Sequence, residues 1–379
     1  MVWDLLTVAF LITGAVQGQR TMQKDKKRLD PEVNMNISEI IRHWGYPAEE
    51  HDIITEDGYI LSVNRIPSNL KYSQDSKPAV FLQHGLLAAG SNWVTNLPNT
   101  SLAYLLADAG YDVWIGNSRG NTWSRRHVTL RPDQNEFWQF SYDEMAKKDL
   151  PAVVNHILKT TGQDQIYYVG HSQGTTIAFI AFSSMPELAS KIKMFFALAP
   201  VATVAFTMFI FFLRGGGAIK WFATNFCNKD PLSVLCGNLF FVLCGFDERN
   251  LNMTRTPVYT THCPAGTSVK NMIHWSQAVH GGKLMAYDYG RKGNMGHYNQ
   301  STPPLYNIQN MKVPTALWSG GHDTLADPKD VKRLLSQVPN LVYHRHIQHW
   351  EHLDFIWGLD APQEMYIEMI KLMSQQDGL

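Results

Sequence analysis

Short runs of β-branched and aromatic residues alternate along the chain with longer segments in which apolar residues recur at helical spacing. The runs predict strands at residues 59–66, 79–83, 112–115, 166–169, 194–198, 314–318 and 341–347. Strands that alternate with helices are typical of a mostly parallel sheet that helices cover on both faces. The pattern therefore predicts an α/β protein with a parallel central sheet.

Two of the intervening helices have recognisable ends. Ser141, with Glu144 three residues later, is a capping box and predicts a helix over residues 141–158, which Gly162 ends. A proline suits the first turn of a helix, so a second helix is predicted over residues 328–335.

The alternation stops between residues 201 and 312, a stretch that contains every cysteine and a run of three glycines. We interpret this stretch as an insertion between two core strands, forming a cap and lid above the sheet. The core is then divided into residues 19–200 and 313–379. Internal repeats are absent from the sequence, which excludes repeat architectures.

Residues 1–18 predict a secretory signal peptide, because the apolar run at 5–16 is followed by the small-residue site Gln17-Gly18. An uncleaved anchor is the alternative, because the residues before the apolar run include Asp4 and no lysine or arginine. Four Asn-x-Ser/Thr sequons predict glycosylation in the secretory pathway. The sequon asparagines are Asn36, Asn99, Asn252 and Asn299.

The composition favours a soluble globular protein. Apolar residues make up 45% of the chain and charged residues 17%, a balance too apolar for disorder. The 33 basic residues offset 33 acidic ones without forming a basic stripe, so we expect no nucleic-acid partner. The 15 histidines would make the protein positively charged in an acidic compartment.

The strongest chemical signal is Gly170-His171-Ser172-Gln173-Gly174, which follows a predicted strand and precedes a helical stretch. Strand, Gly-x-Ser-x-Gly turn and helix together are typical of a nucleophile elbow, which exposes a serine hydroxyl at a helix N-terminus. The glycines leave room where the turn brings backbones together. We therefore predict Ser172 as a nucleophile; the alternative is a small-residue turn with a capping serine.

A serine nucleophile needs a base and a group that orients the base, and in this architecture the acid precedes the histidine. Asp323 lies at the tip of a glycine-rich turn after a predicted strand, and His352 lies in the loop after the next strand. We predict Asp323 as the orienting acid and His352 as the base. The nearest rivals are Asp327, Asp354, His322 and His349.

An oxyanion formed during acyl transfer requires two backbone donors. The amide that follows the nucleophile belongs to Gln173, and the second donor is expected after an early core strand. Leu86, in the segment 83–87, fits that position. An ordinary turn at the end of a strand is the alternative interpretation of this segment.

The sequence gives little support for a metal site. His344, His346, His349 and His352 lie close together, but their spacing is no established ligand pattern. The four cysteines, Cys227, Cys236, Cys244 and Cys263, match no zinc pattern either and suit one or two local disulfides in an oxidising lumen. We therefore expect no metal site.

Six motifs together resemble one family. They are Thr55-Glu56-Asp57-Gly58-Tyr59, Gln83-His84-Gly85-Leu86-Leu87, Gly116-Asn117-Ser118-Arg119-Gly120-Asn121, Gly170-His171-Ser172-Gln173-Gly174, Ser319-Gly320-Gly321-His322-Asp323 and His352-Leu353-Asp354-Phe355. With these motifs the chain resembles the acid lipase family of α/β-hydrolases, which includes lysosomal acid lipase and gastric lipase. The resemblance extends from Asp30 to the C-terminus.

The resemblance implies an α/β-hydrolase fold with an inserted cap and lid. Ser172, Asp323 and His352 match the family's catalytic triad, and Leu86 and Gln173 match its oxyanion hole. The implied reaction is hydrolysis of triacylglycerols or cholesteryl esters at acidic pH, at a lipid–water interface after lid movement, without a cofactor. The implied location is the lysosome, with secretion as the alternative, and no stable protein partner is implied.

The resemblance also assigns the cysteines. Cys227 and Cys236 match the family's cap disulfide, and Cys244 matches its free thiol. Cys263 is additional, which leaves its partner open.

The chain departs from the family between residues 205 and 227, where the apolar run 206–213 and three glycines replace a longer lid with polar helical turns. We therefore predict a shortened lid, whose run 206–213 contacts lipid or lies under the cap. Residues 194–213 are long enough to span a membrane, but Pro200 and the strand predicted in their first half argue against a span.

Two alternative functions follow. One is a secreted digestive-type lipase or a carboxylesterase with an open site. Comparing activity on emulsified long-chain esters with activity on soluble butyrate esters would distinguish a lipase from a carboxylesterase. The other, suggested by the shortened lid, is a catalytically impaired lipid-binding relative, which a serine-directed phosphonate would fail to label.

Overall fold

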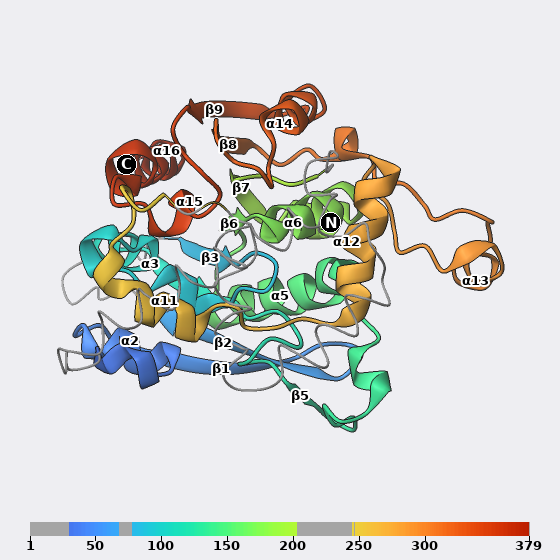
Figure 1. The fold of residues 1–379 in the computed structure, drawn as a ribbon, viewed down its shortest axis with the longest axis horizontal. Coiled ribbons are helices and arrows are strands. Elements are labelled where there is room, and N and C mark those ends of the chain that lie inside the picture. The colour runs from blue at the N-terminus through green and yellow to red at the C-terminus, as the bar shows by residue number, and fades with distance from the viewer. Residues whose placement is uncertain (1–29, 68–77, 203–244, 246, 379) are drawn as a thin grey trace, which may run out of the picture.

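The computed structural model describes residues 30–67, 78–202, 245 and 247–378, and within them the chain forms a nine-stranded sheet. The strands are β1 (Glu49–Ile54), β2 (Tyr59–Ile66), β3 (Ala79–Gln83), β4 (Asp112–Ile115), β5 (Arg126–His127), β6 (Ile166–His171), β7 (Ile192–Leu198), β8 (Thr315–Gly320) and β9 (Leu341–Ile347). They lie in the order β1-β2-β4-β3-β6-β7-β8-β9, and β5 pairs with β2. Figure 1 shows this order running from β9 at the top to β1 at the bottom.

The sheet is parallel from β4 to β9 and antiparallel where β1, β2 and β5 are added. Every residue of β3, β4, β6 and β8 is buried, as expected for strands covered on both faces. The carboxyl ends of β3, β6 and β8 therefore meet at one edge of the sheet, where ligand sites of open α/β sheets form.

Helices cover both faces of this sheet. They are α2 (Ile37–His43), α3 (Leu102–Asp108), α4 (Tyr142–Glu144), α5 (Leu150–Thr161), α6 (Gln173–Ser184), α7 (Pro186–Ala189), α11 (Thr256–His262), α12 (Val269–Gly281), α13 (Gly290–Tyr298), α14 (Pro328–Leu335), α15 (Asp354–Trp357) and α16 (Ile367–Asp377). Tyr167 of β6 donates its hydroxyl hydrogen bond to the Met373 carbonyl in α16, whereas Tyr168 donates to the Gly174 carbonyl in α6. Successive strand residues point to opposite faces, so α16 and α6 lie on opposite sides of the sheet.

The predicted core strands are present with closely similar bounds. Those predicted at 59–66, 79–83, 112–115 and 341–347 have the observed bounds of β2, β3, β4 and β9. β6 ends two residues later than predicted, β7 begins two residues earlier, and β8 begins one residue later and ends two residues later. The helix predicted over 328–335 is α14. The fold class and parallel core are therefore confirmed.

The helix predicted over residues 141–158 begins and ends as expected but is not uniform. The Ser141/Glu144 capping box is present, and Gly162 closes α5 with φ of 69°. Between α4 and α5 lies a π-helical turn at Met145–Asp149. Pro151 lacks an amide hydrogen and cannot donate to the carbonyl four residues earlier, which favours this irregularity.

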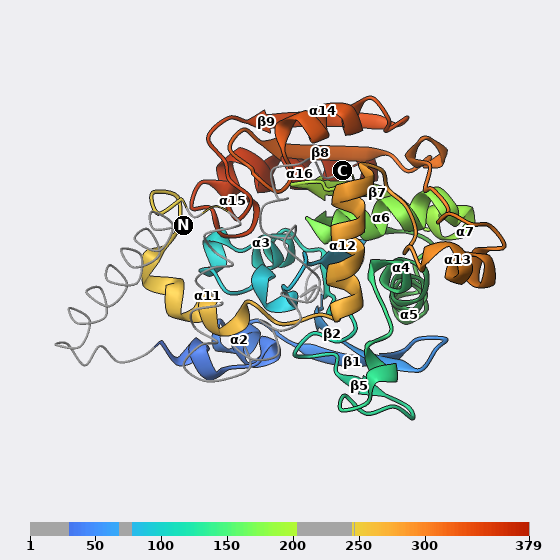
Figure 2. The same ribbon diagram turned by 45° about the vertical axis from the view of Figure 1, so that its right-hand side comes forward.

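Helices α11, α12 and α13 lie between β7 and β8 in the chain, in the later part of the segment predicted as an insertion. Figures 1 and 2 show α12 crosswise to the strands, beside α6. Residues 1–18, Cys227, Cys236, Cys244 and the run 206–213 lie outside the described residues. In the part of the chain that the structure describes, no helix is both long and apolar enough to cross a membrane.

Candidate active site

Ser172 forms the turn between β6 and α6 in a backbone conformation that non-glycine residues rarely adopt. Its φ is 54° and its ψ is −120°. Such a conformation costs on the order of 1–3 kcal/mol and persists only where the surrounding structure enforces it. Since β6 ends at His171 and α6 begins at Gln173, the strain is concentrated in the residue that carries the hydroxyl.

The glycines around Ser172 are required because backbone segments approach closely. A Cβ on Gly170 would lie 2.8 Å from the Gly174 carbonyl, and a Cβ on Gly174 would lie 2.5 Å from the Gln83 carbonyl oxygen. A Cβ on Gly85 would lie 2.9 Å from the Ser172 Cβ. The loop after β3 therefore packs directly against the elbow.

Asp323 and His352 form a buried pair. Nδ1 of His352 lies 2.9 Å from Oδ2 and 3.1 Å from Oδ1 of Asp323, and each residue is 2% exposed. Because an ionised carboxylate only accepts hydrogen bonds, Nδ1 carries the proton and Nε2 is left as the acceptor. Oδ1 also accepts from the amides of Leu325 (2.9 Å) and Ala326 (2.8 Å), which fix the carboxylate in the turn after β8.

The loop that carries His352 lies against the elbow. Nε2 of His171 is 3.0 Å from the His352 carbonyl oxygen, and the two ring centroids are 4.8 Å apart. Burial, together with the neighbouring His352 ring, lowers the pKa of His171 well below its usual value, so His171 is neutral and donates Nε2–H to that carbonyl. Among the described residues the Ser172 hydroxyl makes no hydrogen bond to His352; such bonds often tighten only when substrate binds.

The two predicted oxyanion donors also lie at the elbow. Gln173 is the first residue of α6, so its amide has no acceptor within the helix. Leu86 lies in the loop after β3, between Gly85, which approaches Ser172, and Leu87, whose φ is 59°. The structure thus brings Ser172, Asp323, His352 and both predicted donor residues to the carboxyl ends of β3, β6, β8 and β9.

Comparison with known proteins identifies the family. Two family descriptions match the chain: "alpha/beta hydrolase fold" at residues 78–359 and "partial alpha/beta-hydrolase lipase region" at residues 37–97. Human lysosomal acid lipase/cholesteryl ester hydrolase is 61% identical over 367 residues, which cover 91% of this chain and 92% of that protein. The chain belongs to the α/β-hydrolase lipase family. Human gastric triacylglycerol lipase is 53% identical over 397 residues, covering 98% of this chain and 99% of that relative.

A more distant likeness shows the fold alone. The crystal structure of the naproxen esterase of Bacillus subtilis matches this lipase with a TM-score of 0.53 at 14% sequence identity, covering 93% of this chain and 99% of the esterase. The α/β-hydrolase fold predicted from the sequence is therefore confirmed by family and by structure.

Three of the four rival side chains of this lipase have other partners, and the fourth is exposed. Asp327 caps α14 by accepting from the Lys329 amide at 2.8 Å, and Asp354 accepts from Nδ2 of Asn250 at 2.9 Å. His349 is exposed and pairs with Asp360 at 2.9 Å, while His322 is exposed in the turn after β8.

The histidines on β9 do not join His352. Oγ of Ser319 lies 3.0 Å from Nε2 of His344 and 3.0 Å from Nδ1 of His346. Within the described ranges, no cluster of three or more His, Cys, Asp or Glu side chains could hold a metal ion.

Sequence reasoning used the segment 83–87 only for a backbone donor and missed the role of the His84 side chain. Nδ1 of His84 lies 2.8 Å from the Gly85 carbonyl oxygen, and Nε2 accepts from the Ser118 amide at 3.0 Å. Burial lowers the pKa of His84 to about 4, which keeps the ring neutral with its proton on Nδ1. His84 thereby joins the loop after β3 to the loop after β4.

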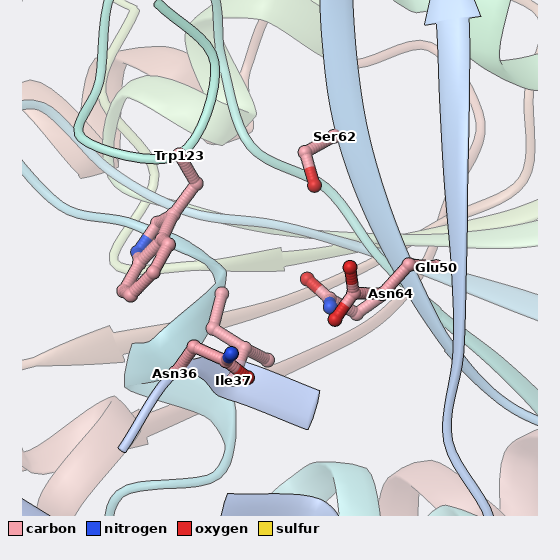
Figure 3. A pocket seen from close by; sticks show the side chains of 6 residues that line it. All are labelled: Asn36, Ile37, Glu50, Ser62, Asn64 and Trp123. Carbon is pink, nitrogen blue, oxygen red and sulfur yellow. The ribbon is translucent and has the colours of Figure 1, made fainter. Parts of the chain in front are cut away.

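Two cavities lie away from the Ser172 hydroxyl. One of about 80 Å³ lies between α2, the first two strands and the loop at Trp123, and Figure 3 shows its lining. The other, of about 420 Å³, lies at the turn between β8 and α14. Asp323 lines the second cavity, whereas Ser172 and His352 line neither.

The predicted sequons have different surroundings. Asn99 and Asn299 are exposed, and Asn252 caps a short 3-10 turn. Asn36 caps α2 through Oδ1, which accepts from the Glu39 amide at 2.9 Å. Asn36, Asn252 and Asn299 lie at helix ends, and Asn99 lies within the 3-10 turn Pro98–Thr100.

Cys263 is a buried free thiol in the described part of the chain, and burial raises its pKa to about 12. The predicted pairing of Cys227 with Cys236 falls outside the described residues.

Proposed function

We propose that this lipase hydrolyses carboxylic esters of neutral lipids through an acyl-enzyme on Ser172. The observation that carries the proposal is the buried His352–Asp323 pair, whose Nδ1–Oδ2 distance is 2.9 Å, on a loop held against the elbow by His171. His352, Asp323 and Ser172 together supply a base, an orienting acid and a nucleophile.

The mechanism follows from the positions of these groups. Nε2 of His352 takes the Ser172 proton as the hydroxyl attacks the ester carbonyl, and the amides of Leu86 and Gln173 hold the oxyanion. Asp323 stabilises the imidazolium, which then gives its proton to the leaving alcohol. Water repeats these steps on the acyl-enzyme and releases the fatty acid.

The substrate class is inferred from the relatives. One human relative is named a lysosomal acid lipase/cholesteryl ester hydrolase and another a gastric triacylglycerol lipase. We infer that triacylglycerols, cholesteryl esters or both are hydrolysed at acidic pH, at a lipid–water interface and without a cofactor. We place the protein in the secretory pathway and propose the lysosome as its destination, with secretion as the alternative.

The organisation around the core is part of the same proposal. Residues 1–18 form the signal peptide, and residues 201–312 form a cap and lid between the core segments 19–200 and 313–379. The alignment with human gastric triacylglycerol lipase spans 397 positions, more than the 379 residues of this chain, so the chain lacks some residues that the relative has. We place this deletion in the lid. Cys227 and Cys236 form the cap disulfide, and the four sequons are the glycosylation sites.

The proposal is tested by activity of the purified protein on triolein and cholesteryl oleate at pH 4.5 and 7.5, compared with Ser172→Ala. We expect the variant to lose activity by a factor of at least about 10³, since residual catalysis then depends on binding and the oxyanion hole alone. Ser172→Ala turnover equal to the wild type would refute the mechanism.

Two further results would favour the alternatives. Hydrolysis confined to soluble butyrate esters would indicate a carboxylesterase. Failure of a serine-directed phosphonate to label Ser172 would indicate the catalytically impaired relative.

A further inference from the structure

The side chain of Gln173 is held by two donors from α12. Its Oε1 accepts from Nε1 of Trp275 at 2.6 Å and from Nδ2 of Asn271 at 2.9 Å. Gln173 is 2% exposed, Asn271 0% and Trp275 4%, so water does not replace these contacts. Nε2 of Gln173 is 3.5 Å from the Met145 sulfur, a weak acceptor, so the two α12 donors are its strong anchors.

Asn271 is itself held in one orientation. Its Oδ1 accepts from the Tyr142 amide at 2.8 Å, and Nδ2 also donates to Oγ1 of Thr267 at 3.1 Å. These partners fix which end of the amide faces Gln173. Trp275 packs on the Tyr142 ring, with centroids 5.1 Å apart. The start of α4 therefore positions both donors.

This contact joins two parts of the chain that are distant in sequence. α12 lies between β7 and β8 in the chain, whereas Gln173 begins α6 and adjoins the strained Ser172. Both views of the fold place α12 beside α6. A shift of α12 would release the Gln173 side chain. The peptide between Ser172 and Gln173 would then lose this anchor and keep those at its carbonyl, which accepts from the Thr175 amide at 2.8 Å and the Thr175 hydroxyl at 2.6 Å.

We propose that Asn271 and Trp275 are positioning residues for ester hydrolysis, which clamp the Gln173 side chain and so aim its backbone amide at the oxyanion. The proposal rests on the function proposed for Ser172 and adds α12 to the machinery of the site. Neither residue touches the reacting atoms; each acts through Gln173.

The test is Trp275→Phe, which keeps an aromatic ring beside Tyr142 and removes the Nε1–H donor together with the five-membered ring of the indole. We expect kcat on a soluble p-nitrophenyl ester to fall on the order of tenfold, a fraction of the loss caused by removing an oxyanion donor, with KM changed less than about twofold. The rate of Ser172 labelling by a phosphonate should fall by a similar factor, since the phosphoryl oxygen occupies the same hole.

Trp138→Phe is the matched control, because Nε1 of Trp138 donates to the Pro132 carbonyl at 2.8 Å and not to the elbow. It should leave kcat unchanged. In a Gln173→Met background the acceptor is gone, so Trp275→Phe should add no further loss. If Trp275→Phe fails to fold, Asn271→Asp is tested in its place. The Asn271→Asp variant keeps an acceptor for the Tyr142 amide and removes the donor to Gln173.

Unchanged kcat in Trp275→Phe, or equal losses with and without the Gln173 side-chain acceptor, would overturn the positioning role. These results are distinct from failure of the proposed function, which would appear as activity retained in Ser172→Ala.

Discussion

Two buried side chains beside the site are uncharged over the same range of pH. Burial lowers the pKa of His84 to about 4 and raises the pKa of Asp354 to about 7. Asp247 and Asp360 add to the rise at Asp354, and two N–H donors, from Glu351 and Asn250, oppose it. Between pH 4 and pH 7 neither group carries a buried charge, which suits the acidic compartment that we propose for this protein.

The Asp354 carboxyl should make the protein less stable as pH rises. Its folded pKa of about 7 exceeds the usual 3.8, so the folded state retains a proton that the unfolded chain releases above pH 4. Stability should fall from pH 4 to pH 7 by up to about 4 kcal/mol through this group. Asp354→Asn, which resembles the protonated acid, should remove most of this dependence.

Urea unfolding at pH 4.5, 6 and 7.5 measures the effect. Asp327→Asn is the matched control, because Asn also caps helices well and α14 should retain its cap. If the stability of Asp354→Asn depended on pH as steeply as that of the wild type, Asp354 would not be the source of the dependence.

At the scale of elements, contacts between loops hold the elbow in place. Arg119, in the loop after β4, pairs with Asp57 at 2.7 Å in the loop between β1 and β2 and with Asp149 at 2.6 Å before α5. This explains why the motifs around Asp57 and Arg119 occur together. The N-terminus of α6 packs on the end of β3 through Gly174, which leaves no room for a side chain.

Gly174→Ala should separate α6 from β3. Its Cβ would lie 2.5 Å from the Gln83 carbonyl oxygen and 3.0 Å from that of His84, both backbone atoms. We expect a loss of about 1–3 kcal/mol in stability. Because the displaced strand leads to Leu86, kcat should also fall on the order of 100-fold.

Thermal unfolding and ester hydrolysis of the same preparation measure both effects. Gly296→Ala in α13 is the control, since a Cβ there meets nothing within 4 Å and should be neutral or slightly stabilising. Wild-type activity in Gly174→Ala would show that β3 and α6 tolerate separation.

At the scale of the whole molecule, a buried cluster joins the start of the described chain to the segment before α11. Arg255 binds Glu32 through Nη1 at 2.7 Å and Nη2 at 2.5 Å, Asp30 at 3.0 Å and the Thr95 carbonyl at 2.6 Å. Arg255 is 3% exposed and Glu32 1%. Nε2 of His262 in α11 also contacts the Glu32 carbonyl, at 3.1 Å.

Arg255→Met should destabilise the protein by about 3–5 kcal/mol, because it leaves Glu32 buried without its partner. Arg126→Met is the control: the Arg126–Asp52 pair is about half exposed and should contribute less than about 1 kcal/mol. Chemical unfolding of the two variants measures the difference. Equal losses of stability in both variants would show that the Arg255 cluster does not stabilise the contact between the start of the described chain and the segment before α11.

The sequence alone determined the order of the core strands along the chain and the type of turn at the nucleophile. Buried β-branched runs are local signals, and Gly-x-Ser-x-Gly between a strand and a helix is a local steric requirement, so Ser172 could be singled out without coordinates. The sequence also indicated Asp323 and His352, because each lies just after a core strand. Four rivals remained until the fold gave three of them other partners and left His322 exposed.

The tertiary structure decided what depends on groups far apart in the chain. The charged strand β1 exists because β2 supplies its hydrogen bonds, and its sequence carries no apolar alternation. The His84 tautomer, the hold of His171 on the His352 loop and the α12 contacts to Gln173 are set by burial and by atoms that the fold brings within 3 Å. Local patterns specify what an element is, whereas hydrogen bonds and desolvation between elements specify where a proton or an amide points.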